Sequence, residues 1–423
     1  MTAFDVRRSP LDDALADALT GPWTRLPAAR RAPIRAAIAR RIFVRVAQQV
    51  GIRVELPQGD PLVEGTATAP GIRLHRPAQF FRRVGRDGLI GFGESYMAGD
   101  WDADDGNDLA SVLTPLARRM ATLVPGVLQR ARRAYDARQP ASEKNDLHGA
   151  KHNIARHYDL SNELFALFLD DTMTYSSALW DEHAPDGPLT AAQVRKIDRL
   201  LDLAGVHAGT RLLEIGTGWG ELAVRAACRG AHVTTLTLSR EQQELAVGKA
   251  IGRGVGELVD VQLLDYRQVT GTYDAVVSVE MIEAVGAEFW PTYFATIDRV
   301  LAPGGRVAIQ AITIDHQRLL ATKGSYTWIH KYVFPGGIIP SLHAVREVVT
   351  EHTRLRITSA TAHGLDYART LHQWLERFHS NAAAVQGLGF DERFIRMWRF
   401  YLAYCEAGFA SGYLDLHQLV LEH

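Results

Sequence analysis

The feature that most constrains the fold is an alternation of strand and helix signals between residues 211 and 311. Short runs of aliphatic and β-branched residues are separated by stretches long enough for helices. Parallel strands need such crossovers, which place helices on both faces of a sheet. The pattern predicts an α/β fold with a doubly wound parallel sheet, with strands at 211–215, 232–238, 259–264, 275–279 and 305–311.

The amino-terminal part has a different pattern and is predicted to form a smaller α+β domain. Between residues 51 and 105, alternating runs and Gly or Asp turns indicate strands, with Gly91–Trp101 among them. A helix is expected from about Asp108 to Tyr135. Polar residues then indicate a linker, so the predicted division is an amino-terminal domain at 1–140, a linker at 141–153 and a second domain at 154–423.

A basic amphipathic helix is expected between Pro27 and Val50, where arginines alternate with Ile34, Ile38 and Ile42 at a spacing of four residues. Two interpretations remain open. The apolar stripe could pack on the domain core as in any surface helix, or the helix could contact anionic lipid headgroups.

Charge and cysteine content exclude several classes of protein. A formal net charge of −1 gives the molecule no overall electrostatic field that would attract nucleic acid, so no nucleic-acid partner is expected. Cys228 and Cys405 are far apart in helical segments, which argues against a disulfide framework and a metal site. No apolar signal region follows Met1 and no long apolar run occurs. We therefore expect a cytoplasmic protein that is at most peripheral to the inner membrane face.

A glycine-rich turn follows the first strand of the alternation, at Glu214-Ile215-Gly216-Thr217-Gly218-Trp219-Gly220. Glycines allow the backbone to leave the strand sharply and to approach a ligand at the carboxyl edge of the sheet. The G-x-G-x-G spacing differs from the G-x-G-x-x-G of a dinucleotide turn. It favours an adenosyl cofactor without a pyrophosphate over NAD.

Further candidates for cofactor contacts follow the next two strands. Thr237, Leu238 and Gln242 stand where a nicotinamide enzyme would place an acidic residue for the ribose. Asp265 offers a carboxylate for an adenine amino group, and Tyr266 offers an aromatic face. Each could equally be an ordinary residue at a strand end.

Several motifs together resemble one enzyme family. Beyond the glycine-rich turn they are Tyr158–Asn162, Thr172–Ser176, Leu236–Gln242, Ser278–Gly286 and Phe334–Gly337. The chain is similar to the cyclopropane fatty acid synthase and mycolic acid methyltransferase family over about 150–415. The segments His75–Pro77 and Gly88–Trp101 resemble the lipid-binding domain of its longer, phospholipid-acting members. The resemblance implies a Rossmann-like class I methyltransferase fold with a catalytic domain at 154–423.

The resemblance also implies a reaction and a site. The alkene of an unsaturated fatty-acyl chain attacks the methyl group of S-adenosyl-L-methionine, and a bound bicarbonate takes a proton from the resulting carbocation. By position, cofactor contacts fall on Tyr175, Ser176, Gly216, Gly218, Thr237, Gln242, Asp265 and Tyr266. The bicarbonate pocket falls on Ser177, Glu283, Gln310, the amide of Ile312, and Tyr367.

Three positions depart from the family pattern. Members commonly have cysteine at Ser177, histidine at Gln310, and histidine at Asp366, which precedes Tyr367. Glutamine can donate a hydrogen bond to an anion but cannot hold a proton. Bicarbonate is therefore less certain as the base, and Asp366 or Glu283 is an alternative base from the protein itself.

Aromatic residues at 326–334 could line the apolar tunnel that an acyl chain requires, or form a buried hydrophobic lid. The favoured product is a cyclopropane fatty acid, formed when the proton leaves the added methyl group of a phospholipid acyl chain. A 10-methylene intermediate of 10-methyl-branched fatty acids, made from oleoyl chains, is the nearly equal alternative. Motifs such as Gln310–Thr313 resemble the actinobacterial members associated with that product.

Other classes of function remain open. Some relatives methylate amines of small molecules on the same fold, and the amino-terminal half alone would be compatible with a lipid carrier that lacks catalysis. The expected partners are unsaturated phospholipid acyl chains and an anionic membrane surface, and full-length relatives suggest a homodimer.

Overall fold

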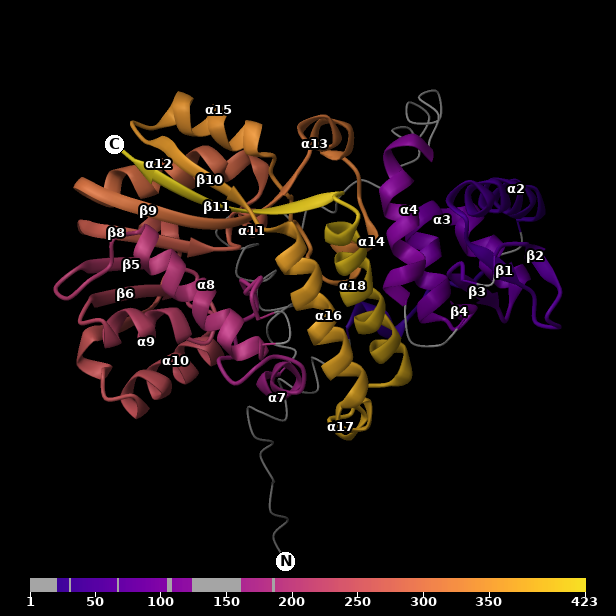
Figure 1. The fold of residues 1–423 in the computed structure, drawn as a ribbon, viewed down its shortest axis with the longest axis horizontal. Coiled ribbons are helices and arrows are strands. Elements are labelled where there is room, and N and C mark those ends of the chain that lie inside the picture. The colour runs from indigo at the N-terminus through magenta and orange to yellow at the C-terminus, as the bar shows by residue number, and fades with distance from the viewer. Residues whose placement is uncertain (1–20, 30–31, 67, 105–108, 124–160, 185–186) are drawn as a thin grey trace, which may run out of the picture.

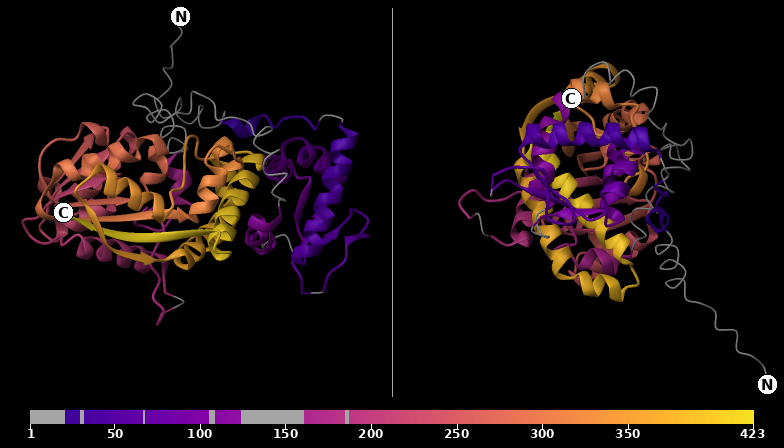
Figure 2. Two further views of the ribbon diagram at one scale, coloured as in Figure 1. Left: turned by 90° about the horizontal axis from the view of Figure 1, so that it is seen from above. Right: turned by 90° about the vertical axis from the view of Figure 1, so that its right-hand side faces the viewer.

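The computed structural model describes residues 21–423, except for 30–31, 67, 105–108, 124–160 and 185–186. The predicted linker at 141–153, the first part of the Tyr158–Asn162 motif and the end of the helix expected to reach Tyr135 lie outside the described residues. A seven-stranded sheet and a smaller amino-terminal domain lie on opposite sides of two long helices (Figures 1 and 2).

The large sheet has the strand order β10-β11-β9-β8-β5-β6-β7. Strands β5 to β9 run parallel, whereas β11 is antiparallel to both of its neighbours. The strands are β5 (Arg211–Ile215), β6 (His232–Thr237), β7 (Val259–Leu263), β8 (Tyr273–Val279), β9 (Leu301–Ile314), β10 (Arg356–Ala362) and β11 (Leu414–Glu422). This arrangement confirms the predicted doubly wound α/β fold of a class I methyltransferase.

Two hydrophobic cores cover the two faces of the sheet, because successive side chains of a strand point to opposite faces. Leu212 of β5 belongs to the core under α8 (Leu189–Leu203), α9 (Glu221–Cys228) and α10 (Arg240–Gly252). Leu213 belongs to the core under the helices on the other face, α12 (Trp290–Val300) and α15 (Leu342–His352). The buried strands read as continuous apolar runs for this reason.

Within the described residues, the amino-terminal domain has a sheet in the order β2-β1-β3-β4 and three α-helices. Its elements are α2 (Pro33–Val50), β1 (Arg53–Glu55), β2 (Pro61–Val63), β3 (Gly71–Leu74), α3 (Pro77–Met97), β4 (Trp101–Ala103) and α4 (Leu109–Leu123). The α+β composition agrees with the prediction.

The strand expected at Gly91–Trp101 is wrong, because most of this segment belongs to α3. Gly91 and Gly93 permit close packing of the helix and do not form turns. A Cβ at Gly91 would lie 2.1 Å from the carbonyl oxygen of Arg83, and one at Gly93 would lie 2.5 Å from Trp328. Gly88 has φ 56° and forms a kink inside the helix.

Helices α16 (Gly364–Ser380) and α18 (Glu392–Ala410) lie between the sheet and the amino-terminal domain (Figures 1 and 2). Arg396 of α18 donates to the carbonyl oxygen of Tyr96 at 2.6 Å. Trp328 packs against Phe400, so this part of the 326–334 segment lies between α3 and α18. The remaining helices are η1 (Pro22–Thr24), α7 (Asn162–Ala166), η3 (Gly256–Leu258), η4 (Tyr266–Gln268), α11 (Ile282–Val285), η5 (Ala287–Phe289), α13 (His316–Thr322), α14 (Trp328–Tyr332) and α17 (Ala382–Gly387).

Candidate active site

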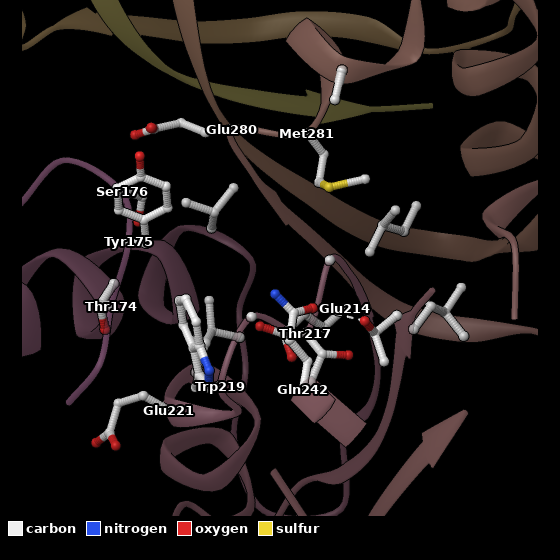
Figure 3. Close-up of a pocket in the computed structure, with 18 of the residues that line it drawn as sticks. Thr174, Tyr175, Ser176, Glu214, Thr217, Trp219, Glu221, Gln242, Glu280 and Met281 are labelled. Atoms are coloured by element: carbon white, nitrogen blue, oxygen red, sulfur yellow. Dashed lines mark hydrogen bonds between the residues drawn. The ribbon is translucent and has the colours of Figure 1, made fainter. Parts of the chain in front are cut away.

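A pocket opens at the carboxyl edge of β5, where the glycine-rich turn leaves the strand (Figure 3). Gly216 has φ 101°, and a Cβ there would lie 2.6 Å from Cγ of Met281. Gly218 has φ 52°, and a Cβ added to this residue would have no neighbouring atom within 4 Å. Both positions require glycine because other residues rarely adopt this left-handed backbone. The open space beside Gly218 belongs to the pocket.

Glu214 lies at the end of β5, on the floor of the pocket. The hydroxyl of Thr235 donates to its Oε2 at 2.6 Å, and the Thr217 and Thr235 hydroxyls are 2.7 Å apart. Burial raises the pKa of Glu214 to about 8, although the Thr235 hydrogen bond and Lys196 oppose the shift. The carboxyl group is therefore a polar site that an ammonium or hydroxyl group of a ligand could complete.

The residues expected after β6 and β7 all line the same pocket: Thr237, Leu238, Gln242, Asp265 and Tyr266. The hydroxyl of Thr237 donates to Oε1 of Gln242 at 2.7 Å, which orients the amide. The Asp265 carboxylate is held by the Arg267 guanidinium at 2.7 and 2.8 Å. The hydroxyl of Tyr266 is buried without a hydrogen-bond partner in the structure.

These groups fit S-adenosyl-L-methionine. The orphaned Tyr266 hydroxyl, the carboxyl groups of Glu214 and Asp265, and the open space beside Gly218 suit a ligand that carries an adenosyl group and an amino acid. No pyrophosphate-binding dinucleotide turn is present in this described strand-to-helix connection.

The opposite wall is the segment from Thr172 to Ser176. Gln193 of α8 donates to the carbonyl oxygen of Ser176 at 2.8 Å, and Lys196 donates to its hydroxyl at 2.6 Å. The hydroxyls of Tyr175 and Tyr401 are 2.7 Å apart. This segment is therefore fixed from both α8 and α18.

Lys196 was not identified from the sequence. It is buried and lines the pocket, and burial lowers its pKa to about 8. The sequence feature that could have identified Lys196 is its position four residues before Leu200, on the apolar face of an amphipathic helix.

A second residue that sequence reasoning missed is Glu280, directly after β8. Its carboxylate points toward the segment that carries Tyr175 and Ser176 (Figure 3). Oε1 accepts from the backbone amide of Ser177 at 2.9 Å and from Nε2 of Gln310 at 2.8 Å. Oε2 accepts from the hydroxyl of Tyr367 at 2.7 Å. The signal was a carboxylate at the carboxyl end of a parallel strand, inside the Ser278–Gly286 motif.

Glu283 lies beside this group on α11. Its Oε1 accepts a hydrogen bond from the backbone amide of Ile312, and its Oε2 is buried without a partner in the structure. Burial raises the pKa of Glu283 to about 8, and the negative charge of Glu280 adds to the shift. At neutral pH the Glu283 carboxyl is therefore largely protonated.

The residues expected to form a bicarbonate pocket are thus brought together, but their donors are already engaged. Ser177, Gln310 and Tyr367 donate to Glu280, and the Ile312 amide donates to Glu283. An added anion would meet two carboxyl groups in place of free donors. The described residues therefore do not fit a resident bicarbonate.

Asp366 lies outside this group. Its Oδ1 accepts from the backbone amide of Trp180 at 2.9 Å, and its Oδ2 is 3.3 Å from Nδ1 of His363. These contacts join the start of α16 to the loop before α8. The structure does not bring the Asp366 carboxylate into the pocket.

Comparison with known proteins identifies the family. The sequence profile described as mycolic acid cyclopropane synthetase matches residues 145–419, well over half of the chain. The chain belongs to this family. It is an S-adenosylmethionine-dependent methyltransferase that acts on fatty-acid double bonds, as its family and relatives show.

Two relatives of this family cover most of the chain. The tuberculostearic acid methyltransferase UfaA1 of Mycobacterium tuberculosis is 50% identical over 407 residues, which is 94% of this chain and 95% of the relative. The cyclopropane-fatty-acyl-phospholipid synthase of Escherichia coli K12 is 34% identical over 361 residues, which is 85% of this chain and 89% of the relative.

A solved member of the family has the same catalytic fold. The mycolic acid cyclopropane synthase CmaA1, in complex with S-adenosylhomocysteine and CTAB, is similar with a TM-score of 0.60 and 28% identity. The match covers 67% of this chain and 99% of that one. The bound S-adenosylhomocysteine of this relative supports S-adenosylmethionine as the cofactor here.

Proposed function

We propose that the enzyme methylates the double bond of an unsaturated phospholipid acyl chain and releases a methylene-branched chain, the precursor of a 10-methyl-branched fatty acid. The observation that carries this proposal is the 50% identity to the tuberculostearic acid methyltransferase, which extends over 94% of the chain and so includes the amino-terminal domain. Identity to the cyclopropane-forming relative is 34%. The cyclopropane, favoured from the sequence, becomes the second candidate.

The two products arise from a common cation. S-adenosylmethionine would supply an electrophilic methyl group on a positively charged sulfur. The π electrons of the alkene form the new C–C bond while the sulfur keeps the electron pair of the broken C–S bond. A hydride shift from the methylated carbon to its neighbour, followed by loss of a methyl proton, gives the methylene branch. Loss of a methyl proton without the shift closes the cyclopropane ring.

Aromatic faces beside Glu280 suit this intermediate. Tyr367 packs against Phe409 with ring centroids 4.4 Å apart, and Tyr175 packs against Trp374 at 5.3 Å. The electron-rich faces of such rings stabilise a nearby cation, and more strongly where water is excluded. A cation on an acyl chain has no polar group for hydrogen bonding, so the ring of Tyr175 and the Glu280 carboxylate, which both line the pocket, are proposed as its stabilisers.

The acyl chain is proposed to be reached at an anionic membrane through α2. Its isoleucines Ile34, Ile38 and Ile42 are 76%, 53% and 50% exposed, at a four-residue spacing that places them along one face. Arg41 and Arg45 are exposed on the same helix, while Phe43 and Ala47 face the domain core. An exposed apolar stripe flanked by arginines is complementary to the surface of an anionic bilayer.

The position of α2 supports a peripheral role in this proposal. Figure 1 places α2 on the amino-terminal domain, away from the seven-stranded sheet. Within the described ranges, no helix is long and apolar enough to cross a bilayer.

The product can be tested with vesicles of phosphatidylglycerol whose oleoyl chains carry deuterium at both alkene carbons. With the purified enzyme and S-adenosylmethionine, we expect vinylic methylene signals by NMR and both deuterium atoms on one chain carbon, because the hydride shift moves one of them. Ring signals with one deuterium on each carbon would establish the cyclopropane instead. Methyl transfer to soluble amines, with none to the vesicles, would refute the proposal.

A further inference from the structure

Glu280 has a backbone conformation that glutamate rarely adopts. Its φ is 52°, in the left-handed region, where the Cβ of any residue other than glycine is crowded. Such strain persists only when the surroundings hold the residue in place, and it is concentrated at functional sites. Met173, on the opposite wall of the same pocket, also has a positive φ of 58°.

The surroundings of Glu280 hold its carboxylate through three hydrogen bonds from separate parts of the chain. The donors are the Ser177 amide, Gln310 Nε2 and the Tyr367 hydroxyl. The orientation of the Gln310 amide is fixed because its Oε1 accepts from Nε2 of Gln418 at 3.0 Å, opposite it on β11. Nε2 of Gln310 therefore has to face Glu280.

These donors coincide with the residues that the family resemblance assigned to a bicarbonate. We propose that the Glu280 carboxylate replaces that anion and is the catalytic base of the reaction, an inference that rests on the proposed function. Glu280 lines the cofactor pocket, whereas Ser177, Gln310 and Tyr367 lie behind it and hold it. Ser177, Gln310 and Tyr367 are then positioning residues in this chain.

The proton transfer can be written in full. After methyl transfer, the hydride shift moves the cation onto the methylated carbon. A C–H bond of the added methyl group then breaks and its electron pair forms the C=C bond of the methylene branch, which neutralises the cation. The proton goes to Oε2 of Glu280, which accepts one hydrogen bond from the described residues, that of Tyr367, and so keeps a lone pair. After product release the proton passes to water. The sum is alkene and sulfonium to methylene product, S-adenosylhomocysteine and one proton.

The neighbouring charges support Glu280 over Glu283 as the ionised carboxyl. Burial raises the pKa of Glu280, but the hydrogen bonds from Tyr367, Ser177 and Gln310 and the charge of Lys196 oppose the shift. Glu283 has only backbone donors, the amide of Ile312 and its own amide, and its pKa is raised to about 8. Two adjacent buried carboxyl groups do not readily both ionise, and the one that accepts more hydrogen bonds is better able to hold the charge. Tyr367, Lys196 and Glu283 are the titratable groups that act on Glu280.

The test uses the full-length enzyme and three forms of residue 280. Glu280→Gln keeps the size of the side chain but cannot accept the proton, so turnover should fall on the order of a hundredfold or more. Glu280→Gly relieves the positive φ and frees the Ser177, Gln310 and Tyr367 donors. Its turnover should be low in buffer depleted of carbon dioxide and should recover when bicarbonate or formate is added. The turnover of the wild-type enzyme should not change when either anion is added.

Two further measurements, of ligand affinity and of melting temperature, do not depend on turnover. Calorimetry with S-adenosylhomocysteine should give near-normal affinity for both variants, which shows an intact fold and cofactor pocket. Bicarbonate or formate should raise the melting temperature of Glu280→Gly but leave that of wild type unchanged, because ligands stabilise only a protein that binds them.

Several outcomes would overturn the assignment. Wild-type turnover that requires bicarbonate, or Glu280→Gln turnover within about threefold of wild type, would show that Glu280 is not the base. A Glu280→Gly enzyme that binds S-adenosylhomocysteine normally but is neither rescued nor stabilised by the anions would show that the donors do not form an anion site. Failure of the proposed function is distinguishable, because wild type itself would then methylate no acyl chain.

Discussion

Nε2 of Gln310 lies 2.8 Å from Oε1 of Glu280, and this contact joins the centre of β9 to the carboxyl end of β8. Gln310 is fully buried and paired with Gln418, which in turn accepts from Arg199 at 2.8 Å. A polar chain therefore extends from Arg199 on α8 through the sheet to the pocket. Such a network orients the carboxylate, because every buried polar group in it has a defined partner.

The hydroxyl of Tyr367 should set the pKa of the Glu280 base. Tyr367→Phe removes a donor that stabilises the charged carboxylate, so the pKa of Glu280 rises. The acidic limb of the pH dependence of kcat should therefore move to higher pH, by about one unit. Tyr273→Phe, which removes a surface hydroxyl bound to the carbonyl oxygen of Thr270, is the control. An acidic limb at the same pH in Tyr367→Phe and wild type would argue against this role.

The space beside Gly218 should be occupied by the cofactor. Gly218→Val places a side chain in that space, so S-adenosylhomocysteine binding measured by calorimetry should be lost. Gly254→Val is a matched control, since Gly254 also has a positive φ (72°) and no atom within 4 Å of a built Cβ, but it lies outside the pocket. Normal binding by Gly218→Val would remove the cofactor assignment, and loss in both variants would indicate backbone strain alone.

The isoleucine stripe of α2 should bind vesicles independently of salt. Replacement of Ile34, Ile38 and Ile42 by Ser should weaken binding to anionic vesicles by at least about tenfold, because the apolar surface that is transferred from water into the bilayer is lost. Exposed Ile251 and Leu320 of the catalytic domain, each changed to Ser, serve as controls. Sedimentation with vesicles measures the effect, and equal binding by variant and wild type would leave α2 as ordinary surface.

The arginines of the same helix should act through charge. Arg40, Arg41 and Arg45 are exposed on α2, and each contributes about 1 kcal/mol at most near an anionic surface. Their replacement by Gln should weaken vesicle binding at low salt, and the difference should disappear at high salt. Arg253, Arg346 and Arg356, exposed on the catalytic domain, provide a matched set. A defect that persists at high salt would point to a structural effect of the substitutions.

Glu283 should make stability depend on pH. The pKa of this carboxyl is about 8 in the folded protein and near 4.5 when unfolded, so the folded state binds a proton that the unfolded state has lost between these values. Its contribution to stability is complete below pH 4.5 and is lost as the pH rises to 8. The melting temperature of Glu283→Gln relative to wild type should therefore increase over that window.

The control for this measurement is Glu288→Gln, since Glu288 is exposed on the neighbouring turn. Its melting temperature relative to wild type should not change with pH. A constant difference between Glu283→Gln and wild type would show that Glu283 is ionised in the folded protein, as expected from the sequence for a residue that stabilises the cation.

The architecture of the catalytic domain and the position of the pocket could be predicted from the amino-acid sequence. Both depend on local patterns. The strand and helix alternation dictates a parallel sheet, and the glycines at 216 and 218 are required by the backbone of one turn. The residues expected at the ends of β5, β6 and β7 meet in one pocket because parallel strands end at the same edge.

The surroundings of Glu280, the helix at Gly91 and the exposure of the α2 isoleucines could not be predicted, because they depend on contacts between distant parts of the chain. The donors to Glu280 are 103, 30 and 87 residues distant in the sequence, so no local pattern reports them. In the sequence, Gly91 and Gly93 resemble turn residues. The structure shows that they lie in a helix, close to Arg83 and Trp328 respectively. An amphipathic helix shows one apolar stripe in sequence, and the fold decides which of its apolar residues are buried. In each case long-range packing supplied the partners that sequence spacing could not.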